Sequence, residues 1–432
     1  MTESHILDNF LANNPEVNFI QLRWMSLSAI LHTKFVTTSG ARDIVSGERQ
    51  YCTNQSGMVM PIATAPQCDI VRVMRCPIEP DWKSLRLCTF TPGHASVMCS
   101  IASEGEEDRY LQCPRQLLEE TVEMIEEHSQ TSFLIGFEIE FTLLDAAFEP
   151  AQSIDQVVSY CMHSGLRCNT LKIMEEICYA LEKANIEVYH FHTEDPHQLE
   201  IALKEKAPME AIDDMVFACE AIRSIAAQHD LKATITPKPL SDASVTNGIH
   251  MHVSSHDVEN ADSFLAGITD KLRTMTVFGI ANYDGFERVK DGKAGQRVGW
   301  GTEHRDLPIR RIKGSHWEIR CADVTANFYL FLATLLRAGM DGVNNSKLLV
   351  QKDVTKLSKD ITEAAWRHEY GVTERLPRSL QEAIDAAKSD ADIAKWIGRY
   401  MFDLYLSIKE VEVESFKGLI PEKRRHRFVR FF

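Results

Sequence analysis

The sequence lacks three features that mark common classes of protein. No stretch approaches the roughly 18 consecutive apolar residues of a membrane-spanning helix, and the opening MTESHILDNFLANNPEV has no basic segment followed by an apolar one. Positive charge is scarce, because 47 lysines and arginines face 62 aspartates and glutamates, which gives a net charge of −15. We therefore expect a cytoplasmic protein that binds neither a membrane nor nucleic acid.

Closely spaced cysteines are also missing. The 11 cysteines stand singly, without a CxxC pair. In a cytoplasmic protein, such scattered cysteines favour reduced thiols over a disulfide framework or a cysteine-bound zinc ion. We predict reduced thiols, most of them buried.

Length and periodicity predict two domains. A chain of 432 residues with 44% hydrophobic residues exceeds one ordinary domain and has ample material for a core. VNFIQLRWMSLSAILHTKFV alternates as paired strands do, whereas CPRQLLEETVEMIEEHSQ has helical spacing with Pro114 in its first turn. We predict a β-rich domain over residues 1–110 and a larger domain over residues 111–432.

Two other segments carry local predictions. TLKIMEEICYALEKAN predicts a helix that buries Leu171, Met174, Cys178 and Leu181. The basic end EKRRHRFVRFF predicts a tail that is solvated or docks on another subunit, in preference to a phosphate patch.

Acids and histidines alternate with hydrophobic residues in four strand-like segments. On a strand of period two, each segment turns its hydrophobic residues to one face and its polar residues to the other. Two carboxylates about 7 Å apart on such a face repel by roughly 2 to 3 kcal/mol. The polar residues are Glu138 and Glu140 in GFEIEF, Glu200 in HQLEIAL, His250, His252 and Ser254 in GIHMHVSS, and His316, Glu318 and Arg320 in SHWEIRC.

Divalent cations would remove this repulsion. Several carboxylates with one or two imidazoles and no thiolate suit Mg²⁺ or Mn²⁺ better than zinc. For any one segment, an ordinary amphipathic strand remains the competing interpretation, but four segments with the same chemistry favour a metal site.

Cationic residues follow in a glycine-rich stretch between residues 288 and 320. Its positive side chains are the partners that nucleotide phosphates need, and its glycines predict a mobile loop that closes over a site. The cations are Arg288, Arg305, Arg310, Lys313 and Arg320, and the glycines are Gly292, Gly295, Gly299 and Gly301.

Six motifs together resemble those of glutamine synthetases. They are GFEIEF, HQLEIAL, KATITPKP, NGIHMHVSS, GTEHRDLPIRRI and HWEIRCADVTANFYL, in the family's order, and the wording WGTEHRDLPIRRIKGSHWEIRC is most similar to the fluG-like branch. The resemblance is strong from about residue 110 onward and loose before it.

The resemblance implies an α+β fold and a ligase. A small β-grasp domain would precede a catalytic domain whose curved antiparallel sheet forms a funnel flanked by helices. Mg²⁺ and ATP would phosphorylate the γ-carboxylate of glutamate or a related acid, and an amine would displace the phosphate. The family also implies a homo-oligomer of stacked rings, a decamer or dodecamer, with active sites between subunits.

The resemblance also assigns residues. For two or more metal ions it implies Glu140, Glu200 and either Glu194 or His192 at one position, with Glu138, His250 and Glu318 at the other. For the acid substrate it implies Asn247, Gly248, Arg288 and Arg320. For ATP it implies His252, Ser254, Arg310, Lys313 and His316, with Arg305 beside the transferred phosphoryl group.

Two departures from the family pattern concern the amine. Where members that use ammonia carry a flap glutamate, this chain has KAGQ, and CTNQSG stands where an aspartate motif is expected. Ammonium would bind poorly without these acids, whereas an organic amine gains binding from its carbon skeleton.

Three interpretations therefore remain open. The first is a γ-glutamyl ligase for an amine other than ammonia. The second is a true glutamine synthetase with a substitute acid such as Asp291. The third is a non-catalytic protein with a regulatory or developmental role.

Overall fold

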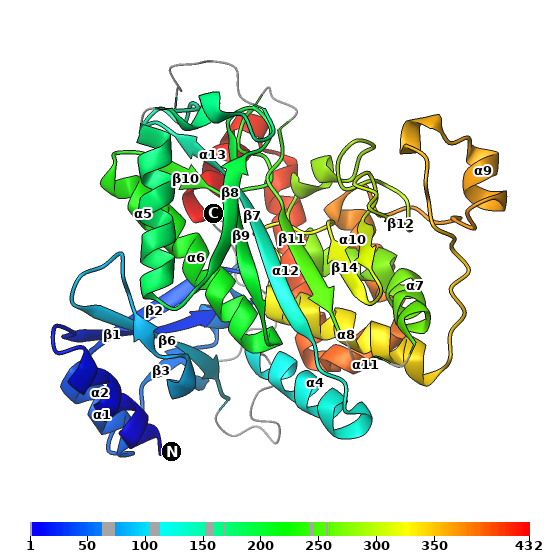
Figure 1. The fold of residues 1–432 in the computed structure, drawn as a ribbon. Helices are drawn as coiled ribbons and strands as arrows, with labels where there is room; N and C mark the ends of the chain where they lie inside the picture. The colour runs from blue at the N-terminus through cyan, green and yellow to red at the C-terminus, as the bar shows by residue number, and fades with distance from the viewer. Residues whose placement is uncertain are drawn as a thin grey trace.

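Two β-sheets organise the chain in the computed structural model (Figure 1). The structure describes residues 2–62, 74–103, 113–151, 159–167, 169–241, 245–255, 258 and 260–432. The predicted domain boundary at residue 110 lies outside these residues. On either side of it, strand β6 ends at Ile101 and helix α4 begins at Pro114.

The first sheet has six strands within the described residues, in the order β2-β1-β6-β4-β3, with β5 paired to β6. Strands β1 and β6 are parallel and the other pairs are antiparallel. The sequence prediction of paired strands near the N-terminus is confirmed by β1 and β2. The elements are α1 Glu3–Asn13, β1 Phe19–Met25, β2 Leu31–Thr37, α2 Thr38–Val45, β3 Cys52–Asn54, α3 Ser56–Val59, β4 Arg75–Pro80, β5 Arg86–Leu87 and β6 His94–Ile101.

The second sheet has eight strands among the described residues, in the order β12-β13-β14-β11-β7-β9-β8, with β10 paired to β7. Its pairs are antiparallel as predicted, except that β12 and β13 are parallel. The strands are β7 Leu134–Leu144, β8 Val188–Thr193, β9 Gln198–Lys206, β10 Lys232–Thr234, β11 Ile249–Ser254, β12 Trp300–Thr302, β13 Ile309–Lys313 and β14 His316–Ile319.

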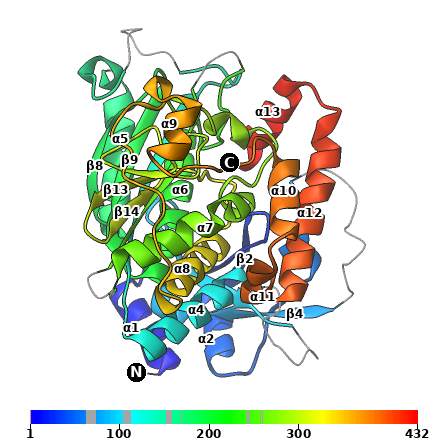
Figure 2. The ribbon, with the colours of Figure 1, turned by 90° about the vertical axis from the view of Figure 1, so that its right-hand side faces the viewer.

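Helices surround this sheet, and α7 and α8 pack closely together (Figure 2). Their close approach requires glycine, because a Cβ on Gly267 would collide with the backbone of Ala338 and Gly342. The helices are α4 Pro114–Ser129, α5 Asn169–Lys183, α6 Pro208–Gln228, α7 Ala261–Gly279, α8 Phe328–Asn344, α9 Glu363–His368, α10 Leu380–Lys388, α11 Ala391–Ile397, α12 Arg399–Lys417 and α13 Pro421–Phe431. No described helix is both long and apolar enough to span a membrane.

The local sequence predictions have mixed outcomes. Helix α4 begins at Pro114 as predicted. Helix α5 exists, but Leu171 and Cys178 of the predicted stripe are only partly buried, because the buried face is centred on Ile173 and Ile177. All nine cysteines in the described part of the chain are free thiols, six of them buried, as expected.

The prediction of a solvated tail is wrong, because α13 folds back onto the molecule, whereas docking on another subunit stays a prediction. Arg425 is buried and donates hydrogen bonds to the carbonyl oxygens of Phe148 and Pro239, at 2.9 and 3.0 Å. Phe428 is buried, and the final residue, Phe432, accepts a hydrogen bond from the Ile235 N–H at 2.7 Å. The hydrophobic residues among the arginines therefore serve as core.

A buried ion pair lies within α12, and its glutamate also binds two loops that connect elements of the first domain. Lys409 Nζ lies 2.9 Å from Glu412 Oε2, and both side chains are at most 1% exposed. The other oxygen of Glu412 accepts from the Ile62 N–H at 2.9 Å and from the Ser28 hydroxyl at 3.4 Å. Removing one member of such a pair leaves a charge buried without its partner.

We predict that Glu412→Ala lowers the free energy of unfolding by about 3 to 5 kcal/mol, because Lys409 is then buried unpaired. Glu410, two residues earlier on α12, pairs with Lys388 in an exposed bridge. Glu410→Ala should therefore cost less than about 1 kcal/mol. Denaturant titration of both variants measures the difference, and equal losses would contradict this view of the buried pair.

Candidate functional site

The second sheet brings the four polar segments side by side. Although they are far apart in sequence, they form the neighbouring strands β14, β11, β7 and β9. In the pairing register, Glu138 lies opposite His250, and Glu140 lies opposite Glu200. Glu318 lies opposite both His252 and Arg310. The alternation seen in the sequence thus becomes one continuous polar face.

The opposite face of these strands anchors them in the core. Ile139, Ile201, Ile249 and Ile319 are each fully buried, and so is Trp317. A shift of one residue in any strand would exchange these side chains with the acids and histidines, so burial fixes the register. The hydrophobic core therefore positions the polar face.

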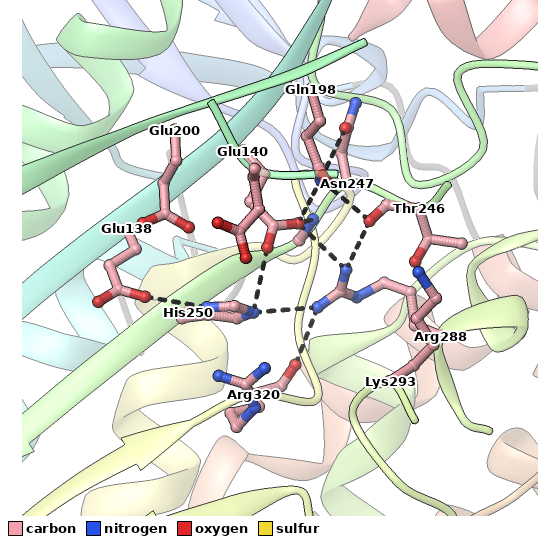
Figure 3. Close-up of polar contacts among 12 residues, drawn as sticks. Glu138, Glu140, Gln198, Glu200, Thr246, Asn247, His250, Arg288, Lys293 and Arg320 are labelled. Carbon is pink, nitrogen blue, oxygen red and sulfur yellow. Dashed lines mark hydrogen bonds and ion pairs between the residues drawn. The ribbon is translucent and has the colours of Figure 1, made fainter. Parts of the chain in front are cut away.

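His250 lies at the centre of the polar face (Figure 3). Its Nδ1 is 3.0 Å from Glu138 Oε2 and 3.4 Å from Glu318 Oε1, and its Nε2 is 3.6 Å from Glu140 Oε1. His252 is the next residue on the same face of β11, and its Nε2 lies 3.1 Å from Glu138 Oε1. The two imidazoles thus link three carboxylates.

Arginines complete the neutralisation of Glu318, which is fully buried. Arg310 Nη1 lies 3.0 Å from Glu318 Oε2, and Arg320 pairs with the other oxygen. Burial alone would raise the pKa of Glu318, but Arg320 and His250 hold that pKa below its ordinary value. Burial likewise opposes ionisation of Glu138, yet hydrogen bonds from His250 and His252 lower its pKa well below the usual range.

The pKa of Glu194 is shifted in the opposite direction to those of Glu138 and Glu318. Burial, followed by repulsion from Glu200 and Glu140, raises its pKa to about 7. Its Oε2 atom is buried without a hydrogen-bond partner. A carboxylate held beside two others without sufficient positive charge is what a divalent cation would stabilise.

Among the residues that the structure describes, four groups of side chains have ligand atoms close enough to share a cation. In each group these atoms lie within 4.8 Å of one another. Three groups combine predicted metal ligands with at most one histidine, and the fourth contains two histidines. The groups are Glu140, Glu194 and Glu200; Glu138, Glu200 and His250; Glu138, His252 and Glu318; and His190, His192 and Glu200.

These groups bear on three sequence predictions. All six predicted ligands lie in one or more of the groups, although their binding of metal remains a prediction. His252, predicted to contact the nucleotide, also lies within reach of Glu138 and Glu318 as a potential ligand. The choice between Glu194 and His192 at the first position is not exclusive, because each shares a group with Glu200.

Arg288 and Gly248 form a tight contact at one end of the face. Arg288 Nη1 lies 3.5 Å from Glu140 Oε2 and donates to the Thr246 carbonyl at 3.3 Å. The Gly248 N–H donates to Glu140 Oε2 at 2.5 Å. A Cβ at residue 248 would lie 2.0 Å from Arg288 Nη2, so any other residue there would displace the Arg288 guanidinium.

The Asn247 side chain holds neighbouring backbone and side-chain groups in place through hydrogen bonds. It is fully buried and donates to the carbonyl oxygens of Thr234 and Thr236, at 3.1 and 3.2 Å. Its oxygen accepts from Gln198 Nε2, which also donates to Glu140 at 2.8 Å. Gln198 was not identified from the sequence, although its position two residues before Glu200 places it on the same strand face.

A cavity of about 690 Å³ opens beside Glu138 at the other end of the face. This volume is typical of small-molecule sites. Four of the residues predicted to bind ATP line it, namely His252, Ser254, Lys313 and His316. Arg310 does not line the cavity and is occupied by Glu303 and Glu318. Arg305 is exposed, with its guanidinium 5.9 Å from the Tyr160 ring.

The loop predicted to be mobile is folded against the molecule. Ala294 is buried and donates to the Arg288 carbonyl at 3.1 Å, and the Leu376 N–H donates to the Gln296 carbonyl at 2.9 Å. Lys293 Nζ reaches Asp195 Oδ2 at 2.9 Å, which joins this loop to the turn before β9. Mobility of the loop stays a prediction.

Comparison with known proteins supplies the family. Residues 111–428 match the family model for the catalytic domain of glutamine synthetase. The chain belongs to the glutamine synthetase family. Members of this family are ligases, and they typically use ATP and divalent metal ions.

Individual relatives bear different names. Protein fluG of Emericella nidulans is 27% identical over 98% of this chain, which spans about half (50%) of that protein's length. The gamma-glutamylpolyamine synthetase GlnA3 of Streptomyces coelicolor is 28% identical, over 79% of this chain and 78% of that protein. The solved structure of a GmaS/ADP complex has a TM-score of 0.82 at 20% identity, covering 96% and 98% of the two chains. The fold class predicted from the sequence is confirmed.

We predict that Glu194→Gln removes much of the stabilisation that Mn²⁺ gives. In chelator, the variant should be at least as stable as the wild type, since it no longer carries the repelled carboxyl. The pKa of the Glu194 carboxyl is near 4.5 in the unfolded wild type and about 7 in the folded one. Between these two pH values the carboxyl is ionised mainly in the unfolded state, so the wild type loses stability as pH rises. The stability of the variant relative to the wild type therefore grows over this range. Thermal melts at several pH values measure both effects.

The control is Glu187→Gln, since Glu187 is exposed and pairs with Lys204. This variant should respond to Mn²⁺ as the wild type does. If Mn²⁺ stabilised Glu194→Gln as strongly as the wild type, Glu194 would not belong to the metal site.

Proposed function

We propose that the protein is an ATP- and Mg²⁺-dependent ligase that forms a γ-glutamyl amide with an amine other than ammonia. The observation that carries this proposal is the single polar face on which carboxylates, imidazoles and arginines converge beside a cavity of nucleotide size. Phosphoryl transfer depends mainly on positioning and on neutralising charge, and this face provides both.

Two sets of ligands fit divalent cations. Glu140, Glu194 and Glu200, whose ligand atoms lie close together, would hold one ion. Glu138 and Glu318 would hold another with His250, whose Nδ1 lies 3.0 and 3.4 Å from them, and His252 is within reach. Mg²⁺ or Mn²⁺ bound there would neutralise charge on the transferred phosphoryl group. The carboxylate-rich donor set and the orphaned Glu194 oxygen fit such hard cations.

The nucleotide would occupy the 690 Å³ cavity. Ser254, Lys313 and His316 would contact it there, and Arg310 would reach its phosphates from the neighbouring strand. Arg305, exposed at the rim, would approach the transferred phosphoryl group from the side of Tyr160.

Glutamate or a related acid would lie near Arg288 and Arg320. The Nε atoms of both arginines are buried and have no hydrogen-bond partner. Such donors favour an anionic ligand, because an unsatisfied buried donor costs about 1 to 3 kcal/mol. The Gly248 backbone would line the same end, with Asn247 supporting it from behind. The γ-carboxylate of the acid would attack the γ-phosphate of ATP and give a γ-glutamyl phosphate and ADP. The amine would then displace phosphate from this intermediate.

The amine is inferred from the loop after Arg288. This loop directs Lys293, a cation, toward Asp195. Its acid, Asp291, is exposed, accepts from Gln296 at 3.0 Å and lines a separate cleft with residues of α10 and α12. Asp291 is therefore poorly placed to substitute for an ammonium-binding acid. The similarity to GlnA3, whose name specifies a polyamine substrate, favours an organic amine as well.

Two alternatives remain as outcomes of the test. One is a true glutamine synthetase, because several relatives bear that name. The other is a non-catalytic regulatory or developmental protein, for which the similarity to fluG is the support.

We also propose that the protein is cytoplasmic and assembles as a homo-oligomer of stacked rings, a decamer or dodecamer.

The deciding experiment measures phosphate release from Mg²⁺-ATP with L-glutamate and a panel of amines, and identifies products by mass. We expect turnover with a mono-, di- or polyamine that far exceeds turnover with ammonium. Glu318→Ala should lower the rate by roughly a hundredfold or more, because it removes a proposed metal ligand. Glu187→Gln serves as the control.

Each other outcome selects an alternative. Turnover with ammonium alone would identify a glutamine synthetase. Nucleotide binding without turnover on any amine would favour the regulatory interpretation.

A further inference from the structure

A second pair of histidines lies at the edge of the polar face, and only one of the two, His192, was among the ligands predicted for Mg²⁺. His190 and His192 are two residues apart on the edge strand β8, so they share a face of that strand. Their rings are stacked, with centroids 5.4 Å apart and planes 16° apart. Neither the phosphate chemistry nor the carboxylate groups described above require His190.

Glu200 completes a group of three with these histidines. In the pairing of β8 with β9, His192 lies opposite Glu200, and its Nε2 is 3.2 Å from Glu200 Oε1. Ligand atoms of His190, His192 and Glu200 all lie within 4.8 Å of one another. The His190 side chain has no hydrogen bond to the described residues, is exposed and lines the 690 Å³ cavity, so an ion could reach it from solvent.

The donor set of this group differs from the carboxylate-rich groups beside it. Two imidazole nitrogens and one carboxylate oxygen suit borderline cations such as Zn²⁺, Co²⁺ and Ni²⁺, whereas Mg²⁺ prefers oxygen ligands. Three protein ligands also leave the fourth position of a tetrahedral Zn²⁺ open. The sheet thus holds hard and softer donor sets next to each other.

We propose that His190, His192 and Glu200 form a separate site for a transition-metal cation, with Zn²⁺ preferred over Mg²⁺. Glu200 is shared with the proposed Mg²⁺ group that contains Glu140 and Glu194. An ion held by the two histidines withdraws Glu200 from that group. Zn²⁺ therefore lowers the affinity of the neighbouring site for Mg²⁺ or Mn²⁺, and the pair of sites acts as an antagonistic switch.

Calorimetric titration of the full chain with ZnCl₂, in an excess of MgCl₂, tests the site itself. His190→Ala should weaken Zn²⁺ binding by at least about tenfold, as expected for the loss of a direct ligand. His192→Ala should do the same. The matched control is His128→Ala, since His128 is an exposed histidine on α4 and its loss should leave Zn²⁺ binding unchanged.

The exposed His190 is the decisive position, because its removal should leave folding intact, as a thermal melt would verify. Wild-type Zn²⁺ affinity in His190→Ala would overturn the proposal. Weak Zn²⁺ binding by the wild type in MgCl₂ would also overturn it.

Paramagnetic resonance of Mn²⁺ tests the antagonism independently of enzyme activity. One equivalent of Zn²⁺ should increase the free Mn²⁺ signal in the wild type, and the same Zn²⁺ concentration should have little effect in His190→Ala. An equal release of Mn²⁺ from both proteins would show direct displacement at the carboxylate groups and would contradict the switch.

Discussion

The main constraint on the structure is the repulsion among carboxylates that the pairing of β14, β11, β7 and β9 brings close together. Each acid is acceptable alone, but in register they repel, and burial strengthens the repulsion. Histidines and arginines offset part of it, as His250 does between Glu138 and Glu318. Glu194 has a raised pKa and an oxygen without a hydrogen bond, although His192 Nδ1 lies 3.5 Å from that oxygen, so the protein's own positive charge there is insufficient.

The rest of the fold keeps this charge in place. Isoleucines on the reverse of the strands fix the register, and α7 and α8 pack together at glycines. The buried Arg115 on α4 extends this support to the first sheet, because it lies 2.9 Å from the buried Asp213 on α6 and 2.7 Å from the partly exposed Asp81 after β4. A rigid scaffold of this kind is what a preorganised site for phosphoryl transfer requires.

The sequence predicted the components of the site better than their arrangement. Alternation with period two identified Glu138, Glu200 and Glu318, because hydrophobic residues flank each of them. The strand order depends on contacts between distant segments, which local patterning does not reveal. His190 and Gln198 were missed although the same alternation places them beside identified residues. The C-terminal helix was misjudged because the carbonyl partners of Arg425 lie 186 and 277 residues away in the chain.

The central claim is that divalent cations and a nucleotide jointly occupy the polar face. The most direct measurement is a crystal structure grown with Mn²⁺ and ADP, with Mn²⁺ located by anomalous scattering. The account predicts one peak among Glu140, Glu194 and Glu200, another among Glu138, His250 and Glu318, and ADP in the cavity lined by Ser254 and Lys313. ADP bound elsewhere, or no Mn²⁺ within coordination distance of these carboxylates, would contradict it.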